Sequence, residues 1–252
     1  MNDDTLLRVE SISKRFGGRA VVDQVGFEVR QGEFMAIIGP NGAGKTTLFN
    51  LISGGVRSDS GRIMFKGRDT THVRSDLLCK GGLSRTFQIN NVFVGASVRE
   101  NIRLAVISFR GKSWDMLTPS KSLFSDEVER MALAVNLHDQ LDKSVQELAY
   151  GDRRRLELAM ALAAEPDLIL LDEPTCGVPL VERGPLIELI QATMQTRAMT
   201  ALLIEHDMDI VFSVADRIAV MNRGRLIADD TPEAIKNNAK VQEVYLGGAA
   251  VA

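Results

Sequence analysis

The sequence predicts an α/β fold in which a helical stretch interrupts a core of alternating strands and helices. Short apolar runs that suit buried parallel strands occur in the first third of the chain and again after Pro166. Between them, residues 97–164 carry apolar residues at helical spacing and few strand signals. The return of strand–helix alternation indicates one α/β core with an insertion, in which right-handed crossovers join parallel strands.

The first third of the chain predicts mainly strands. A Gly17-Gly18 turn follows two strand-like segments, and a partly alternating pattern continues after it. Residues 34–38 form an apolar run that leads into a glycine-rich loop, as a buried parallel strand does. The expected elements are strands at residues 7–9, 11–13, 21–29, 34–38 and 62–65 and a helix at residues 45–53.

The middle of the chain predicts helices. Ser97 is a candidate helix cap, with Glu100 three residues later as its capping-box partner. Residues 125–137 and 152–164 each carry apolar residues on one helical face, and residues 111–122 predict a loop. After Pro166 the expected strands are residues 168–171, 200–204 and 218–221, and the expected helices are residues 181–195 and 207–215.

Composition excludes several classes of protein. The 252 residues include 30 Lys and Arg against 33 Asp and Glu, a net charge of −3 that argues against a dedicated nucleic-acid binder. Cys79 and Cys176 form neither a metal-binding pattern nor a disulfide framework, which favours a reducing compartment. No apolar run approaches the ~18 residues of a spanning helix, and no secretory leader is apparent. We therefore expect any role at a membrane to be that of a peripheral subunit.

A phosphate-binding motif occupies the glycine-rich loop. Residues 39–46, Gly-Pro-Asn-Gly-Ala-Gly-Lys-Thr, fit G-x-x-x-x-G-K-[ST] between a predicted strand and a predicted helix. Glycines let backbone N–H groups turn toward phosphate oxygens, and the helix N-terminus adds partial positive charge. We expect Lys45 to reach the β- and γ-phosphates, Thr46 to coordinate Mg²⁺ and Thr47 to add a phosphate contact. The predicted nucleotide ligands are Gly39, Asn41, Gly42, Ala43, Gly44, Lys45, Thr46 and Thr47.

Two acids, Asp172 and Glu173, follow the apolar run at residues 168–171. A buried strand would deliver both to its carboxyl end, beside the phosphate loop, where open α/β sheets bind ligands. We expect Asp172 to hold Mg²⁺ and Glu173 to orient or deprotonate the attacking water. Gln88 is a candidate to contact both Mg²⁺ and that water. His206 follows another predicted strand; a single histidine is more often structural than catalytic, so its role depends on the rest of the chain.

Together these motifs resemble the ATP-binding subunit of ABC transporters, over about residues 5–247. The resemblance identifies residues 39–47 as Walker A, 168–173 as Walker B with the catalytic glutamate, Gln88 as the Q-loop and His206 as the H-switch. It places Phe16 where an aromatic ring stacks on adenine, although a core residue at a strand end is an equally good interpretation. It also counts Val21 among the nucleotide contacts.

A closer resemblance is to the ATPases of branched-chain (hydrophobic) amino-acid importers. The segments that carry it are Arg15–Gly18, Arg85–Gln88, Leu148–Gly151, Ile204–Met208 and the tail from Thr231 to Gly247. The resemblance implies a P-loop NTPase core, a RecA-like mixed sheet flanked by helices with an antiparallel β part, plus an inserted α-helical subdomain. Residues 1–247 would form a single nucleotide-binding domain, with its core at about 1–87 and 165–235, its helical subdomain at about 88–164, and a C-terminal helix and tail at 236–252.

The family also implies partners and cofactors. It predicts a head-to-tail dimer that binds two ATP molecules with Mg²⁺, each between Walker A of one subunit and the signature motif of the other. Here the residues acting in trans are Ala149, Tyr150, Gly151 and Asp152, at a helix N-terminus that suits a γ-phosphate. The expected partners are membrane permease subunits, a second ABC ATPase subunit (the same chain or a paralogue) and, indirectly, a periplasmic solute-binding protein, with no nucleic acid. The expected location is peripheral, on the cytoplasmic face of the inner membrane.

Two segments depart from the family pattern. The general signature is LSGGQ and the branched-chain subgroup reads LAYGQ, so Ala149 and Tyr150 favour the subgroup, whereas Asp152 replaces the glutamine. Near a bound triphosphate, the Asp152 carboxylate is electrostatically unfavourable unless it faces away or the arginines at 153–155 compensate its charge. The alternative interpretation is that Asp152 simply caps the helix. The D-loop ends in Pro179, where the family has Asp or Asn. Because both departures would serve the partner's ATP site, we hypothesise that the two sites of a heterodimer differ in rate.

The apolar segment at residues 89–94 has two interpretations. It is either an interface for the membrane subunits or a hydrophobic loop packed on the helical stretch.

For the whole chain, the leading hypothesis is an ATPase that energises import of branched-chain or related amino acids. The alternatives are a soluble ABC-type ATPase acting on ribosomes or DNA, and a small P-loop kinase. The single Walker A, the net charge and the signature-like segment favour the first.

Overall fold

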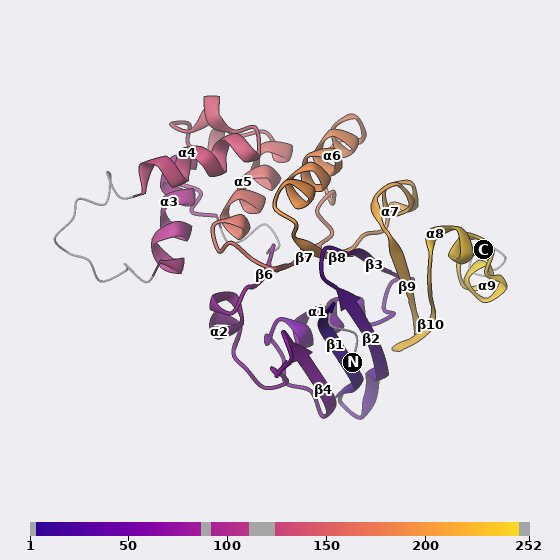
Figure 1. Ribbon diagram of the computed structural model, residues 1–252. Helices are drawn as coiled ribbons and strands as arrows, with labels where there is room; N and C mark the ends of the chain where they lie inside the picture. The colour runs from indigo at the N-terminus through magenta and orange to yellow at the C-terminus, as the bar shows by residue number, and fades with distance from the viewer. Residues whose placement is uncertain (1–3, 87–91, 111–123, 247–252) are drawn as a thin grey trace.

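The larger sheet of the protein is built from short apolar strands that are covered on both faces. The computed structural model describes residues 4–86, 92–110 and 124–246. Within them, the order of this sheet is β10-β9-β3-β8-β7-β6, and every neighbouring pair except β10 with β9 is parallel (Figure 1). The strands are β3 (Phe34–Ile38), β6 (Leu83–Arg85), β7 (Leu168–Asp172), β8 (Thr200–Ile204), β9 (Arg217–Asn222) and β10 (Arg225–Asp230). β3, β7 and β8 are buried throughout, which explains their continuous apolar runs.

A smaller antiparallel sheet packs against this layer. Its order within the described residues is β2-β1-β4-β5, and β1 pairs with β2 along nearly its whole length. The strands are β1 (Thr5–Phe16), β2 (Arg19–Arg30), β4 (Ser60–Phe65) and β5 (Arg68–Asp69). The C-terminal half of β2 alternates between buried and exposed residues, as expected for a sheet with one face on the core.

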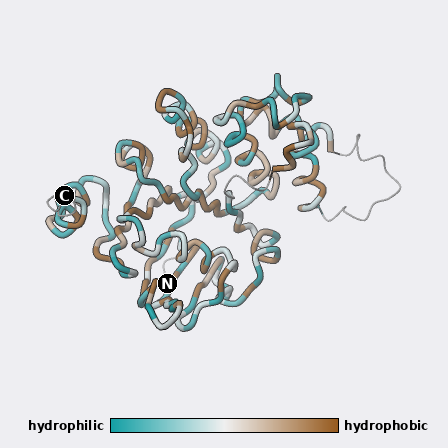
Figure 2. Tube along the Cα trace, turned by 180° about the vertical axis from the view of Figure 1, so that it is seen from behind, coloured by the Kyte–Doolittle hydropathy of each residue, from teal (hydrophilic) through white to brown (hydrophobic). Residues whose placement is uncertain are grey.

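The two faces of the parallel sheet build two separate cores. Ala36 and Ile38 of β3 contribute to one core, whereas Met35 and Ile37 contribute to the other, because successive strand residues point to opposite faces. The first core includes the helices that follow β6, and the second is closed by the antiparallel sheet and α1 (Lys45–Ile52). Figure 2 shows the hydrophobic strands crossing the middle of the molecule between these layers.

Three helices form a group of their own beyond β6 (Figure 1). They are α3 (Val98–Phe109), α4 (Ser125–Ala134) and α5 (Tyr150–Leu162). The other helices are α2 (Ser75–Lys80), α6 (Leu180–Thr196), α7 (Met208–Val214), α8 (Pro232–Lys236) and α9 (Ala239–Leu246), with 3₁₀ turns at His138–Gln140 and Val145–Glu147. In the described part of the chain, none of the helices combines the length and the apolar character that a bilayer crossing requires.

Most predicted elements are present, and the misses have local causes. The Ser97–Glu100 capping box forms in both directions. The helix predicted at 125–137 ends at Ala134, because Asn136 adopts a left-handed backbone and a 3₁₀ turn follows. The helix predicted from 152 begins at Tyr150. The predictions omitted α2, α8, β5, β6 and β10, and all of these except β10 are too short to show a periodicity. The loop predicted at 111–122 lies outside the described residues.

Candidate active site

The carboxyl ends of three neighbouring strands bring the predicted catalytic residues to one edge of the parallel sheet. The strand order places β3 beside β8 and β8 beside β7. The glycine-rich loop follows β3, Asp172 ends β7 with Glu173 directly after it, and His206 follows β8. Residues about 130 positions apart in sequence therefore converge, because parallel strands end at the same edge.

The backbone around the glycine-rich loop explains why its last glycine is required. Gly44 has φ +103°, and a Cβ there would lie 2.4 Å from the backbone oxygen of Val21. The neighbouring Ala43 accepts a backbone hydrogen bond from Gly224 at 2.9 Å. β2 and the β9–β10 turn therefore support the loop from outside. Val21, predicted to contact nucleotide, makes its close approach to the loop through its main chain.

The Lys45 ammonium lies inside the loop that it is predicted to serve. Its Nζ donates to the backbone oxygens of Gly39 at 2.6 Å and Pro40 at 3.3 Å, and the residue is buried. Burial lowers the pKa of Lys45, while the nearby Glu173 and Asp172 carboxylates raise it. The cation is thus held among acceptors that phosphate oxygens can replace.

The other predicted loop residues divide by exposure. Asn41, Gly42 and Thr46 are exposed and Thr47 is half-buried, so their polar groups are open to a ligand. Phe16 ends β1 with half of its surface exposed (50%), which excludes the core interpretation and leaves a ring face open. The Lys14 ammonium lies 5.5 Å from the centre of that ring.

Asp172 is a buried carboxylate with one oxygen paired and one free. Its Oδ2 accepts from Arg85 Nη2 at 2.6 Å, whereas Oδ1 is buried and has no hydrogen-bond partner among the described residues. A buried oxygen without a partner is costly, so it marks a place where a ligand completes the site. Asp172 also acts electrostatically on Lys45, the residue before Thr46, and a carboxylate beside a phosphate-binding loop suits Mg²⁺ with bound phosphates and water.

Glu173 and His206 form a hydrogen-bonded pair across two strand ends. Glu173 Oε1 lies 2.9 Å from His206 Nε2, and both side chains remain partly exposed. The Glu173 backbone has φ +50°, and its N–H donates to the oxygen of Ile204 at 2.9 Å. A non-glycine residue in the left-handed region is uncommon and is typical of functional turns. The structure therefore brings together two residues that α6 and β8 separate in the sequence.

Glu205 lies beside the predicted catalytic pair, and the sequence patterns did not single it out. Its carboxylate is buried; Oε1 accepts from the amide N–H of Thr175 at 2.9 Å and from the Thr175 hydroxyl, and Oε2 accepts from the N–H of His206 at 2.8 Å. It therefore joins the turn after Glu173 to the turn that carries His206. An acid directly after the apolar run 201–204 was the available signal, because a carboxylate is buried only when its hydrogen-bond partners are present.

The segment predicted to act in trans forms the N-terminus of α5. Ala149 is the N-cap residue and makes no side-chain capping bond, so the interpretation of Asp152 as a cap is wrong. Instead, the Asp152 carboxylate accepts from Gln140 Nε2 at 3.0 Å and pairs with Arg155 at 3.4 Å. Of the arginines at 153–155, Arg155 alone pairs with it among the described residues.

A buried arginine joins α5 to the predicted D-loop. Arg154 donates to Glu157 at 2.9 Å, to the Tyr150 hydroxyl at 3.2 Å and to the backbone oxygen of Cys176 at 3.1 Å. Gly177 has φ +78°, and a Cβ there would lie 2.7 Å from the Tyr150 ring. The two elements predicted to face a partner's nucleotide are therefore packed on each other. Beyond them, Leu180 and Val181 expose 78% and 83% of their surface.

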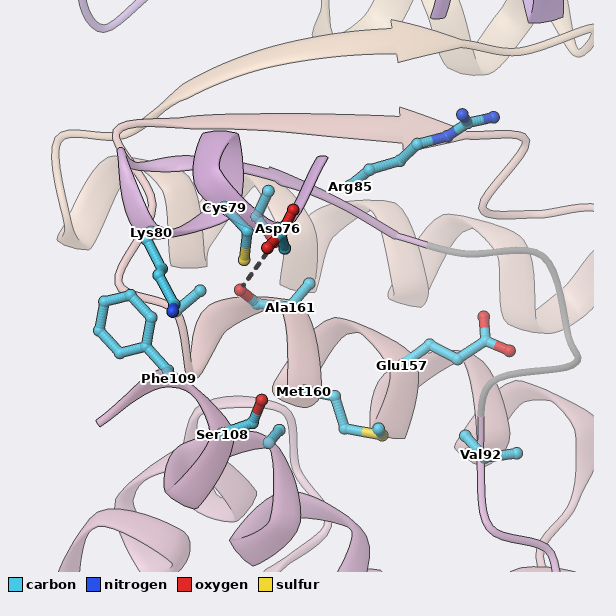
Figure 3. Close-up of a pocket in the computed structure, with 13 residues that line it drawn as sticks. Asp76, Cys79, Lys80, Arg85, Val92, Ser108, Phe109, Glu157, Met160 and Ala161 are labelled. Atoms are coloured by element: carbon cyan, nitrogen blue, oxygen red, sulfur yellow. Dashed lines mark hydrogen bonds between the residues drawn. The ribbon is translucent and has the colours of Figure 1, made fainter. Parts of the chain in front are cut away.

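A cavity of about 420 Å³ lies between α2 and β6 on one side and α3 and α5 on the other. Figure 3 shows its lining, which mixes apolar side chains such as Val92 and Met160 with Asp76, Lys80 and Glu157.

Of the apolar segment at residues 89–94, Phe93 and Val94 are 58% and 46% exposed. Val92, in contrast, is buried in the core that includes α3, α4 and α5, so the packed-loop interpretation holds for Val92 but not for the two exposed residues. Gln88 and residues 89–91 lie outside the described residues.

Comparison with known proteins decides the family. A family model described as ABC transporter matches residues 22–176, more than half of the chain. The chain belongs to the ABC transporter ATPase family. A second model, branched-chain amino acid ATP-binding cassette transporter, matches residues 225–251 of this ABC ATPase.

Individual relatives agree with this ABC assignment. The high-affinity branched-chain amino acid transport ATP-binding protein LivG of Salmonella typhimurium is 37% identical over 254 residues, covering 97% of this chain and 98% of LivG. BraF of Pseudomonas aeruginosa, with the same description, is 36% identical over 253 residues, covering 97% and 98%. The crystal structure of the ADP conformation of an ATP-binding cassette of an ABC transporter superposes with a TM-score of 0.81 at 30% identity, covering 96% of this chain and 99% of that one.

The comparisons confirm the predicted fold class and the resemblance to ABC ATPases. The chain is an ATP-binding ATPase of a transporter family. The roles of the individual site residues stay predictions, to which the geometry of the sheet edge adds support.

Proposed function

We propose that this protein hydrolyses ATP on the cytoplasmic face of the inner membrane and thereby energises import of branched-chain or related amino acids. The observation that carries the catalytic part is the 2.9 Å contact between Glu173 and His206, next to a buried lysine in a phosphate-binding loop. The C-terminal family match and the likeness to LivG and BraF support the solute class. They favour transport over action on ribosomes or DNA.

In this mechanism the phosphate loop binds the nucleotide through its backbone. Amides at the start of α1 meet the phosphate oxygens, and the Lys45 ammonium exchanges the carbonyls of Gly39 and Pro40 for the β- and γ-phosphates. Phe16 offers its exposed ring to adenine. Because burial already holds Lys45 in the loop, little reordering accompanies binding.

Hydrolysis follows from the position of Glu173. His206 holds Oε1, which orients the carboxylate so that Oε2 accepts a proton from water as that water attacks the γ-phosphorus. The bond to the β–γ bridging oxygen breaks and ADP leaves with that oxygen. Glu205 keeps the His206 turn in register with the turn after Glu173.

A divalent cation fits the same edge. Thr46, Asp172 and Gln88 are the residues that would hold Mg²⁺, and the buried, unpartnered Oδ1 of Asp172 is the observation that supports this set. When bound, Mg²⁺ neutralises charge on the β- and γ-phosphates. Among the described residues, no group of three His, Cys, Asp or Glu side chains is placed to hold a metal.

The proposed assembly contains a second ABC ATPase subunit and two permease subunits, with a periplasmic solute-binding protein acting through the permeases. The exposed Leu180 and Val181 beside the D-loop support a dimer interface on that side. The cavity between α2 and α3, flanked by exposed Phe93, supports a permease contact on the other. We also propose the division into a catalytic core at about 1–87 and 165–235 and a helical subdomain at about 88–164.

The test is uptake by proteoliposomes that contain the protein with the permeases and binding protein encoded beside it. We expect ATP-dependent uptake of labelled leucine, isoleucine or valine, and Glu173→Gln should abolish uptake and ATP turnover while ATP still binds. Transport of no branched-chain amino acid with intact ATPase activity would refute the solute class. Normal turnover by Glu173→Gln would refute the assigned base.

A further inference from the structure

We propose that Arg85 is a positioning residue that fixes the Asp172 carboxylate for Mg²⁺, an inference that rests on the proposed ATP site. Arg85 ends β6, the strand next to β7, which ends in Asp172. The guanidinium reaches across the strand ends and donates from Nη2 to Asp172 Oδ2 at 2.6 Å. With Oδ2 engaged, Oδ1 is the oxygen left for a cation and its bound water, and it is buried without another partner among the described residues.

Arg85 is itself held by the helix that follows the phosphate loop. Its Nη1 donates to Asn50 Oδ1 at 2.6 Å and to Ser53 Oγ at 3.3 Å, both at the C-terminal end of α1. The guanidinium carbon lies 5.9 Å from the centre of the Phe49 ring. One side chain thus ties Walker B to the Walker A helix, so the two halves of the predicted cation site move as a unit.

The chemistry of the contacts requires arginine. The planar guanidinium directs Nη1 and Nη2 to different partners at once and stacks over an aromatic ring, whereas a lysine ammonium is a compact point charge. The Arg85 side chain is 14% exposed and that of Asp172 is 1% exposed, so neither charge is screened by bulk water. Removing the arginine would leave a buried carboxylate free to rotate and to lose its orientation toward the cation.

Arg85 also connects the predicted cation site with the cavity that α2, β6, α3 and α5 enclose. Arg85 is among the residues that line that cavity, and Figure 3 shows its guanidinium extending away from the other lining side chains. β6 then leads within three residues to Gln88. The route from the cavity to Asp172 is therefore the Arg85 side chain and its hydrogen bond to Oδ2.

The experiment compares nucleotide binding with and without Mg²⁺. Binding of a fluorescent, non-hydrolysable ATP analogue is measured in EDTA and then as Mg²⁺ is added, for the native protein, Arg85→Gln and Arg85→Lys. We expect all three to bind the analogue in EDTA within about twofold of one another. The Mg²⁺ concentration at the midpoint should rise by about 10-fold or more in Arg85→Gln, as for other partners of metal ligands, and by less in Arg85→Lys.

Controls separate positioning from folding and from the ATP site itself. Arg99, on α3, forms a surface ion pair with Asp142 that is remote from the predicted cation site. Arg99→Gln removes that pair and should leave the Mg²⁺ midpoint unchanged. Asn50→Ala removes the second anchor of Arg85 and should raise the midpoint less than Arg85→Gln, which keeps the test decisive if Arg85→Gln does not fold. A midpoint that stays within twofold or falls in Arg85→Gln overturns the inference alone. Failure of the native protein to bind the analogue overturns the proposed ATP site as well.

Discussion

The edge that holds the protein's own nucleotide site and the surface predicted to face a partner's site are built differently. At the first, strand ends fix the residues: Lys45 and Asp172 are buried, and Glu173 and His206 contact each other at 2.9 Å. At the second, Ala149 and Cys176 are exposed and side-chain contacts among helix and loop residues set the shape. The first region matches its family motif at every fixed position, whereas the second departs at Asp152 and Pro179. The residues that the chain offers to its own nucleotide are therefore positioned by strand ends, whereas the surface predicted to meet a partner's nucleotide is shaped by side-chain packing.

The largest effect is expected from Lys45→Ala. Loss of a buried ammonium that pairs with phosphate costs about 2–5 kcal/mol, so ATP affinity should fall by at least about thirtyfold. Binding is measured with a fluorescent ATP analogue. Lys236→Ala, which removes a lysine stacked on Phe212, is the matched control and should bind normally. Affinity within threefold of the native value in Lys45→Ala would mean that the loop backbone alone supplies the binding energy.

A smaller effect, confined to the second region, is expected from Gly177→Ala. The added Cβ would meet the Tyr150 ring at 2.7 Å on a backbone with φ +78°, at a cost of about 1–3 kcal/mol. The D-loop should shift, and turnover by the assembled transporter should fall about tenfold, while the isolated subunit binds ATP normally.

The control for this prediction is Gly184→Ala in α6, where an added Cβ has open space. It should leave both binding and turnover unchanged. A loss of ATP binding by the isolated Gly177→Ala subunit would show that the two regions are not separable. Unchanged turnover would show that the packing of Tyr150 on the D-loop does not position the trans surface.

The sequence predicted the first region better than the second for a physical reason. Backbone geometry forces the motif of a phosphate loop, and two acids at the end of a buried strand are typical of a ligand-binding sheet edge, so the pattern predicted where Lys45, Asp172 and Glu173 lie. The contacts that orient them were not found: Glu205 meets Thr175 across a gap of 30 residues, and Arg85 meets Asp172 across 87. Such contacts depend on strand order, which a local pattern does not carry. The role of Arg154 was missed because three adjacent arginines point in different directions on α5.

Phe93→Asp should affect transport more than ATP hydrolysis. Phe93 is 58% exposed near the cavity between α2 and α3, and a charge there would oppose an apolar partner surface. Uptake in proteoliposomes should fall several-fold, while the basal ATPase activity of the isolated subunit stays within about twofold. Leu133→Asp, at another exposed apolar residue (65%) on α4, is the matched control and should transport normally. Reduced solubility or a lower melting temperature in Phe93→Asp would instead assign the residue to the hydrophobic packing.

The smallest effect is expected from Asp152→Gln, which restores the residue of the subgroup motif. Arg155 and Gln140 already hold the Asp152 carboxylate, and the first turn of α5 favours a negative charge, so its field at a partner's γ-phosphate is largely offset. Turnover by the assembled transporter should change by less than about threefold. If instead it rises about tenfold, the carboxylate faces the phosphate and slows the partner's site. In a heterodimer, that result would predict that Glu173→Gln and the matching substitution in the other ATPase subunit reduce turnover to different extents. Equal losses of turnover would show that the two ATP sites are equivalent despite Asp152 and Pro179.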